Sequence, residues 1–151
     1  MPVPMPVPVI SNGDDDQRAP EQQAMGKTTI PYWNPLAADQ AHHWRWLDGL
    51  EGQVQELILS QDAATGEITR LTRFLPGADT TTFGGKAHPF PEEIMIVSGR
   101  LFDAAFALWL EPGHYASRPP GEVHGPFRTD EGALVLDISF PGRSPNACPS
   151  A

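Results

Sequence analysis

Apolar and polar residues alternate with a period of two along most of the chain from Ile30 onward, and turn signals interrupt the alternation about every ten residues. Residues 54–60 and 67–75 both show this alternation, and the sequence Asp-Ala-Ala-Thr-Gly between them is typical of a turn. Short alternating segments of this kind are common in antiparallel sandwiches and barrels. The pattern therefore predicts an all-β fold in which these two segments form a hairpin.

Further short segments are expected to complete the sheets at 80–83, 94–97, 115–118, 123–127 and 133–140. The first of these is predicted to be extended because its threonines are β-branched. Residues 104–110, Ala-Ala-Phe-Ala-Leu-Trp-Leu, are compatible with a helix when taken alone. Their short length and their position between two turn signals favour a buried strand.

Composition divides the chain into one domain and two loose ends. Residues 1–25 combine alternating prolines with a run of three aspartates, a composition that buries too little apolar area to offset its ordering entropy. We therefore expect a flexible arm at 1–25, a single domain at 26–142, and a loose tail at 143–151. A chain of 151 residues has room for about one core.

Charge and hydropathy exclude several kinds of partner. The formal net charge of −9 repels phosphate backbones and argues against nucleic-acid binding. No apolar run approaches the roughly 18–20 residues that a bilayer span needs, and the proline-rich start lacks the basic region of a secretory signal. The lone Cys148 fits a reducing compartment. We expect a cytoplasmic protein with no membrane partner.

Two segments about thirty residues apart carry the candidate chemistry. His88 and Glu92 lie around prolines that interrupt regular strand pairing, and His124 follows a Pro-x-Gly turn. Imidazole and carboxylate are natural donors for a first-row divalent metal, and inward-facing residues of a small barrel come within bridging distance. The sequence therefore predicts a metal site formed by His88, Glu92 and His124, with coordination positions left open.

These two segments resemble the two motifs of the cupin superfamily. The first motif is matched by His88, then three residues, Glu92, six residues and Gly99; the second is matched by Pro-x-Gly-x-x-His ending at His124. The form of the second motif is most similar to small single-domain cupins, which include β-diketone-cleaving dioxygenases and the cupin domains of ChrR-type anti-sigma factors. The resemblance implies a cupin-type double-stranded β-helix, or jelly-roll barrel, over about residues 50–140.

The chain departs from the cupin pattern at one position. Lys86 stands where the family has its first histidine, and a lysine is cationic at neutral pH and a poor metal ligand. In one reading, Glu92 becomes a full ligand, giving the two-His-one-carboxylate set that holds non-haem Fe(II), and Lys86 attracts an anionic substrate or acts as a base. In the other, the metal site has been lost. Zn, Mn and Ni are alternatives to Fe(II).

Several other residues are candidates for roles around this site. Tyr115, with Lys86, is a candidate proton-transfer residue, and Arg70, Trp109 and Arg118 are candidates for lining a substrate cavity. Two further residues have a simpler interpretation. Glu93 is expected to face away from Glu92, and His114 is expected to be a turn histidine, although it is the best replacement ligand.

The resemblance and the ligand set lead to three functional hypotheses. The first is an Fe(II) dioxygenase that uses O₂ on a small enolisable or carbonyl-bearing substrate. The second is a non-redox lyase, isomerase or decarboxylase with a Lewis-acid metal, and the third is a non-catalytic metal- or ligand-binding cupin. Exposed edge strands suggest in addition that two copies pair as a homodimer.

Overall fold

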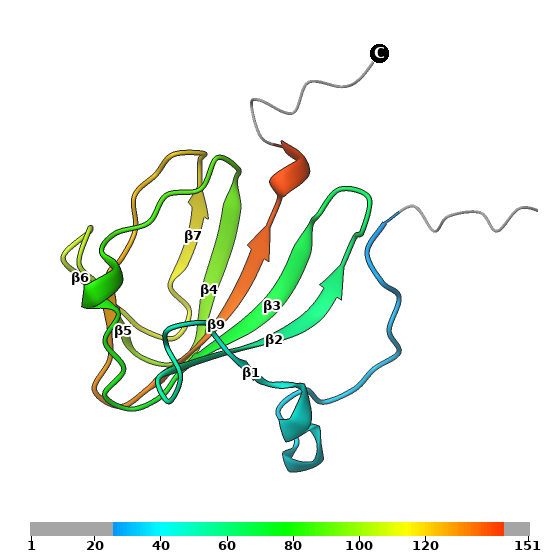
Figure 1. The fold of residues 1–151 in the computed structure, drawn as a ribbon, viewed down its shortest axis with the longest axis horizontal. Coiled ribbons are helices and arrows are strands. Elements are labelled where there is room, and N and C mark those ends of the chain that lie inside the picture. The colour runs from blue at the N-terminus through cyan, green and yellow to red at the C-terminus, as the bar shows by residue number, and fades with distance from the viewer. Residues whose placement is uncertain (1–25, 144–151) are drawn as a thin grey trace, which may run out of the picture.

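The computed structural model describes residues 26–143 as two antiparallel β-sheets that face each other in a jelly-roll sandwich (Figure 1). The predicted arm at 1–25 and the predicted tail, apart from its first residue, lie outside the described residues. The larger sheet has the strand order β1-β2-β3-β9-β4-β7, and the smaller has the order β6-β5-β8. The prediction of an all-β fold is confirmed.

The strand bounds follow the alternation of the sequence in most places. The larger sheet contains β1 (Arg45–Trp46), β2 (Val54–Gln61), β3 (Ile68–Phe74), β4 (Glu92–Gly99), β7 (Tyr115–Arg118) and β9 (Ala133–Ser139). The smaller sheet contains β5 (Leu101–Asp103), β6 (Leu108–Leu110) and β8 (Phe127–Arg128). Three short 3₁₀ helices complete the described chain: η1 (Ala38–His43), η2 (Thr81–Phe83) and η3 (Pro141–Arg143).

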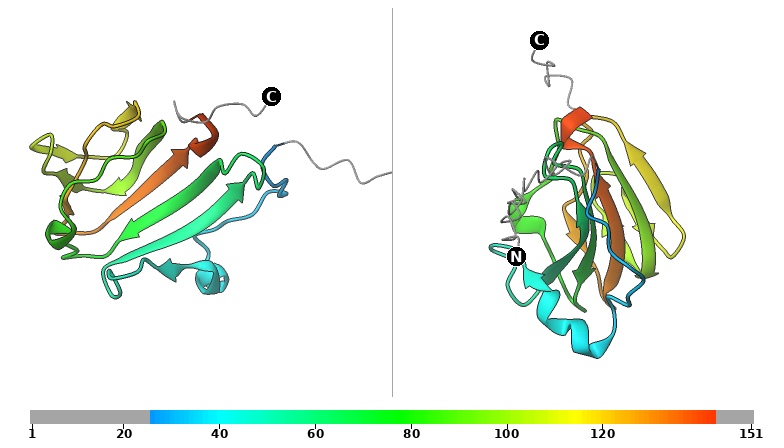
Figure 2. Two further views of the ribbon diagram at one scale, coloured as in Figure 1. Left: turned by 45° about the horizontal axis from the view of Figure 1, so that its top comes forward. Right: turned by 90° about the vertical axis from the view of Figure 1, so that its right-hand side faces the viewer.

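The predicted hairpin is present as β2 and β3, which pair in antiparallel register from Val54 with Phe74 to Gln61 with Ile68. Figure 2 shows the larger sheet as a strongly twisted layer, with β1 and η1 at one of its edges. None of the three helices in residues 26–143 has the length and apolar character that a transmembrane span requires.

Three local predictions were wrong or only partly right. Residues 81–83 form η2 and not a strand. The segment 104–110 is divided, because the Asp103 carboxylate accepts a hydrogen bond from the Ala105 N–H at 3.0 Å and the chain turns there before β6 begins. In the predicted strand 123–127, His124 pairs only as an isolated bridge, and β8 begins at Phe127.

The apolar core lies between the two sheets and fills one end of the sandwich. Its members alternate along the strands and so point to the same interior face. The buried cluster consists of Leu50, Val54, Phe74, Ala78, Ile94, Ile96, Leu101, Ala133 and Val135. The same inward face of β4 and β9 continues past this cluster into polar residues, and this continuation positions the candidate site.

The glycine that ends the first motif has a steric role. Gly99 closes β4 with φ of 70°, and a Cβ atom at this position would collide with the carbonyl oxygen of Gly132. We expect Gly99→Ala to lower the free energy of unfolding by more than the roughly 1–2 kcal/mol that a left-handed conformation costs an L-residue, measured by urea denaturation.

Gly52→Ala is the matched control for this prediction. Gly52 has a similar φ of 80°, but a Cβ atom there meets nothing within 4 Å. This variant should therefore show the conformational cost alone. Equal losses in the two variants would contradict a steric role for Gly99.

Candidate metal centre

The strand β4 delivers Glu92 to the interior because side chains alternate along it. Glu92, Ile94 and Ile96 are buried, whereas Met95 on the other face is exposed. Glu93 also lies on the outer face, where the Tyr115 hydroxyl donates a hydrogen bond to it. Its predicted outward orientation is confirmed.

Backbone hydrogen bonds bring the two motif segments together. Lys86 and His124 form an isolated antiparallel bridge in which each N–H donates to the other's carbonyl oxygen, at 2.8 and 2.9 Å. Nearby, the Gly121 N–H donates to the His88 carbonyl oxygen at 2.7 Å. The Pro-x-Gly turn of the second motif therefore fixes His124 beside the first motif.

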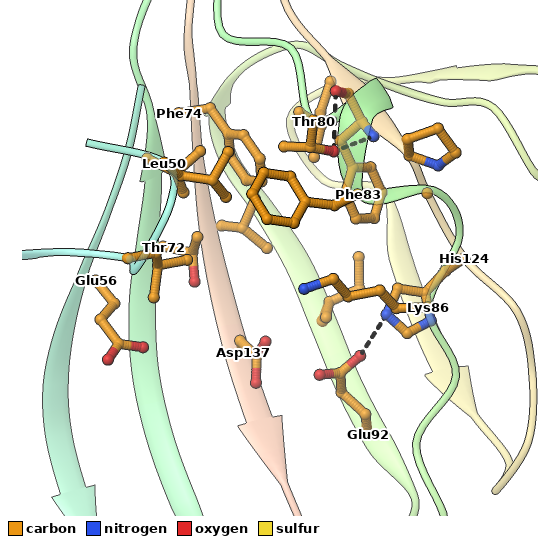
Figure 3. Close-up of a pocket in the computed structure, with 18 of the residues that line it drawn as sticks. Leu50, Glu56, Thr72, Phe74, Thr80, Phe83, Lys86, Glu92, His124 and Asp137 are labelled. Atoms are coloured by element: carbon orange, nitrogen blue, oxygen red, sulfur yellow. Dashed lines mark hydrogen bonds and ion pairs between the residues drawn. The ribbon is translucent and has the colours of Figure 1, made fainter. Parts of the chain in front are cut away.

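The three predicted ligands converge on one point. The candidate ligand atoms of His88, Glu92 and His124 all lie within 4.8 Å of one another. Glu92 Oε1 is 3.8 Å from His88 Nε2. Glu92 Oε2 is 3.9 Å from His124 Nε2 (Figure 3). Glu92 and His124 are buried, and His88 is partly exposed. This group of residues could therefore hold a metal ion.

The chemistry of these donors fits a divalent first-row metal. Burial lowers the pKa of both histidines, and the positive charge of Arg118 adds to this effect at each ring. The imidazoles are therefore neutral at neutral pH, and each offers a nitrogen lone pair to a metal. Two neutral imidazoles and a carboxylate are the donor set of non-haem iron sites and of many zinc sites.

A buried arginine holds the carboxylate of this group in place. Arg118 Nη1 donates a hydrogen bond to Glu92 Oε2 at 3.0 Å, and its Nη2 lies 3.8 Å from Asp103 Oδ2. Asp103 is itself buried and accepts the Gly125 N–H at 2.9 Å. Arg118 is only 6% exposed, so it is better placed to orient Glu92 than to contact a substrate, the role predicted for it.

A second arginine links three carboxylates on neighbouring strands. Arg70 Nη2 donates to Asp137 Oδ2 at 3.1 Å and lies 3.9 Å from Glu92 Oε1, and its Nη1 is 3.5 Å from Glu56. Burial raises the pKa of Asp137, Arg70 opposes this effect, and Glu92 reinforces it. Sequence reasoning missed both Asp137 and Glu56. The sequence does indicate Asp137, because it lies two residues after Val135 on an apolar strand and its side chain therefore points to the same inner face.

These residues line a cavity of ≈ 320 Å³ with two chemically different regions. In Figure 3, Glu92, Asp137 and Lys86 point into one space, while Phe74 and Phe83 border it on another side. Arg70 and Arg118 also line this cavity, as predicted. Their roles toward a substrate stay predictions.

Two predicted site residues lie elsewhere. Tyr115 is 57% exposed and lies on the outer face of β7. Side chains alternate along the strand, and the positions that face inward are Ala116 and Arg118. Trp109 packs against Phe102 on the smaller sheet, with ring centroids 5.4 Å apart, and borders a separate pocket. Their placement gives no support to the predicted proton-transfer and substrate-binding roles.

His114 is a turn residue and not a replacement ligand in this structure. It is exposed, and its Nδ1 accepts a hydrogen bond from the Glu111 N–H at 2.7 Å within the turn between β6 and β7. It is absent from the lining of the cavity. The interpretation of His114 as a turn histidine is the one that the geometry favours.

The bridge between residues 86 and 124 makes a gain-of-ligand variant informative. Directly opposed residues in an antiparallel pair project their side chains to the same face, so a histidine at position 86 would lie beside the His124 ring. Removing a residue that only hydrogen-bonds to a metal ligand changes the metal affinity about 10–100-fold. We expect Lys86→His to tighten Zn²⁺ binding by at least about tenfold, measured by chelator competition.

A histidine added at position 87 would test the geometry of that prediction. Ala87→His is the matched control because residue 87 has the opposite parity to residue 86 along the extended chain. This variant should leave the affinity unchanged. Equal tightening in both variants would mean that residue 86 does not face the group.

The fold has many counterparts among solved structures. KdgF from Halomonas sp. superposes with a TM-score of 0.52 at 20% identity, over 65% of this chain and 84% of that one. An RmlC-like cupin from Shewanella frigidimarina superposes with a TM-score of 0.50 at 19% identity, over 66% of this chain and 90% of that one. A protein of unknown function from Rhizobium leguminosarum superposes with a TM-score of 0.53 at 17% identity, over 76% of this chain and 99% of that one. At such low identity these similarities establish the fold alone.

The comparison by sequence agrees with the motifs. A search of curated proteins finds no match. The family model of the ChrR cupin-like domain matches residues 36–139, a range that contains both motifs and every strand of the larger sheet. The chain therefore belongs to the ChrR cupin-like domain family of the cupin superfamily.

Proposed function

We propose that this protein is a metal-dependent cupin enzyme, and specifically an Fe(II) dioxygenase that acts on a small enolisable or carbonyl-bearing molecule. The observation that carries the proposal is the convergence of two neutral imidazoles and one carboxylate within 4.8 Å. This donor set is typical of Fe(II) oxygenases because it leaves coordination positions free. The ligand group also lies on the wall of a cavity large enough for a small molecule.

His88, Glu92 and His124 would hold the metal in this proposal. Bound Fe(II) supplies Lewis acidity toward carbonyl oxygens and redox chemistry with O₂. Arg118 keeps Glu92 in one orientation through their hydrogen bond at 3.0 Å, so the carboxylate is preorganised for its ligand role.

The remaining cavity residues prepare the substrate. The ammonium of Lys86 favours the enolate form of a carbonyl compound, because it places positive charge where negative charge develops. Apolar side chains such as Phe83 and Phe127 exclude water from the bound molecule and strengthen that interaction. These residues therefore bind, orient and polarise the substrate beside the metal ligands.

Oxygen uptake tests the reaction class. The full chain is loaded anaerobically with Fe(II), and O₂ consumption is followed after addition of a β-diketone or an α-hydroxyketone. The proposal expects substrate-dependent O₂ uptake that the His124→Ala variant abolishes. Turnover without O₂ uptake in Zn-loaded protein would replace this proposal by a non-redox lyase, isomerase or decarboxylase. Tight metal binding without any turnover would leave a metal-binding cupin.

A further inference from the structure

In the part of the chain that the structure describes, the cavity has one cation without a carboxylate partner. Within residues 26–143, Lys86 makes no ion pair and no side-chain hydrogen bond, and its Nζ lies 5.5 Å from the centroid of the Phe83 ring. Figure 3 shows the lysine extending into the space between Phe83 and Asp137. The ammonium is therefore available to a ligand.

The two arginines on the cavity wall are already neutralised. Arg118 lies between Glu92 and Asp103, and Arg70 lies among Asp137, Glu92 and Glu56. The Nε atoms of both arginines are buried, so a ligand in the cavity does not reach them. Among the described residues, a bound anion consequently finds a single free positive side chain.

Apart from the candidate metal ligands and two threonines, Thr72 and Thr80, the remaining side chains that line the cavity are apolar. Phe83 is 42% exposed, so much of its ring is available for contact, and it packs against the backbone at Gly49. The apolar residues that share the cavity with it include Leu47, Leu50, Val54, Phe74, Ile94 and Phe127. Such a surface favours a hydrophobic group and disfavours a second charge.

We infer that the substrate is a monoanion with an apolar body: a molecule that carries one carboxylate or enolate, which Lys86 binds, and a hydrophobic group, which lies against Phe83 and its neighbours. This inference rests on the proposed function and names its substrate class. A dicarboxylate is excluded, because its second charge would face either the apolar wall or Glu56 and Asp137.

Calorimetric titration of the Zn-loaded full chain tests this inference with four probes. The probes are 3-phenylpropanoate, its neutral amide, the short acid propanoate, and the dicarboxylate glutarate. We expect 3-phenylpropanoate to bind best and to exceed its amide by at least about tenfold, the usual size of a charge-assisted hydrogen bond. Propanoate lacks the apolar body and should bind more weakly.

Variants separate the contribution of Lys86 from that of the metal. Lys86→Met should reduce the preference for acid over amide by about tenfold. Lys27→Met is the matched control, since Lys27 is the other lysine of the chain, is absent from the cavity lining, and contacts Thr69 and Phe140. It should keep the preference. Phe83→Ala should weaken 3-phenylpropanoate several-fold and leave propanoate unchanged.

The result that overturns the inference differs from the one that overturns the proposed function. Tighter binding of glutarate or of the amide would refute the monoanion assignment while the metal remained bound. An acid preference that survives in Lys86→Met would refute the assignment of Lys86 as the group that binds the anion. Failure of the wild-type chain to retain a metal would refute the proposed function, whatever the ligand series shows. Thermal unfolding of each variant confirms that it is folded before it is titrated.

Discussion

Glu92→Gln should abolish tight metal binding, with an expected loss of more than about 100-fold in metal affinity. Residues that only hydrogen-bond to metal ligands already contribute about 10–100-fold, and a ligand should contribute more. The neutral amide keeps the shape of the side chain but removes the charge that a divalent ion requires. Chelator competition with Zn²⁺ or Co²⁺ measures the effect.

The neighbouring glutamate provides the control for this experiment. Glu93→Gln changes the same residue type one position along β4, on the outer face, where it accepts a hydrogen bond from Tyr115. Its metal affinity should equal that of the wild type. Retention of tight binding in Glu92→Gln would show that Glu92 serves only as the partner of Arg118 and would remove the basis for a two-His-one-carboxylate centre.

Arg118→Met should give the largest loss of stability among the cavity variants. The substitution leaves Glu92 and Asp103 buried without the cation that lies between them, at 3.0 and 3.8 Å. Removing one partner of a buried ion pair costs about 3–5 kcal/mol, because the remaining charge stays desolvated. Urea denaturation at neutral pH should show a decrease of this size in the free energy of unfolding.

A double-mutant cycle shows whether the loss of stability in Arg118→Met comes from its ion pair with Glu92. Combining Arg118→Met with Glu92→Gln removes a buried charge of each sign, so the double variant should be more stable than the sum of the single losses predicts. Arg128→Met is the control, since Arg128 is exposed and lies over the Phe102 ring, a contact worth about 1 kcal/mol or less. Additive losses would mean that Arg118 and Glu92 act independently.

The sequence was sufficient to predict the hairpin and the convergence of the three candidate ligands. The hairpin depends on local alternation of polarity, and the ligand group depends on spacing within two motifs. Residues 54–60 and 67–75 alternate in polarity, and the alternation directly determines strand pairing and the face of each side chain. His88, Glu92 and His124 were identified from donor chemistry and from the spacing of two motifs. The parity rule also placed Glu92 inside and Glu93 outside.

Other features differ from the expectations that the sequence gives. The apolar run at 104–110 reads as a strand, but the carboxylate of Asp103 caps a turn at Ala105, and the chain reverses there. Tyr115 and Trp109 were chosen by residue type, yet strand parity and the smaller sheet direct them away from the cavity.

The ion network behind the ligands follows no motif. Arg118 of β7 meets Asp103 of β5, and Arg70 of β3 meets Asp137 of β9, so each pair forms only when the strands are assembled. Within residues 26–143, this network neutralises Arg70 and Arg118, whereas Lys86 has no carboxylate partner. The departure from the cupin pattern at position 86 thus acquires a physical meaning that the motif alone did not provide.

X-ray absorption spectroscopy of the metal-loaded full chain tests the central claim most directly. The spectrum at the metal edge reports the number of histidine ligands and the identity of the other donor atoms. The account predicts two imidazoles, oxygen donors and no sulfur, with loss of one imidazole in His88→Ala. A centre without imidazoles, or a spectrum that is unchanged when His88 and His124 are both replaced by alanine, would contradict it.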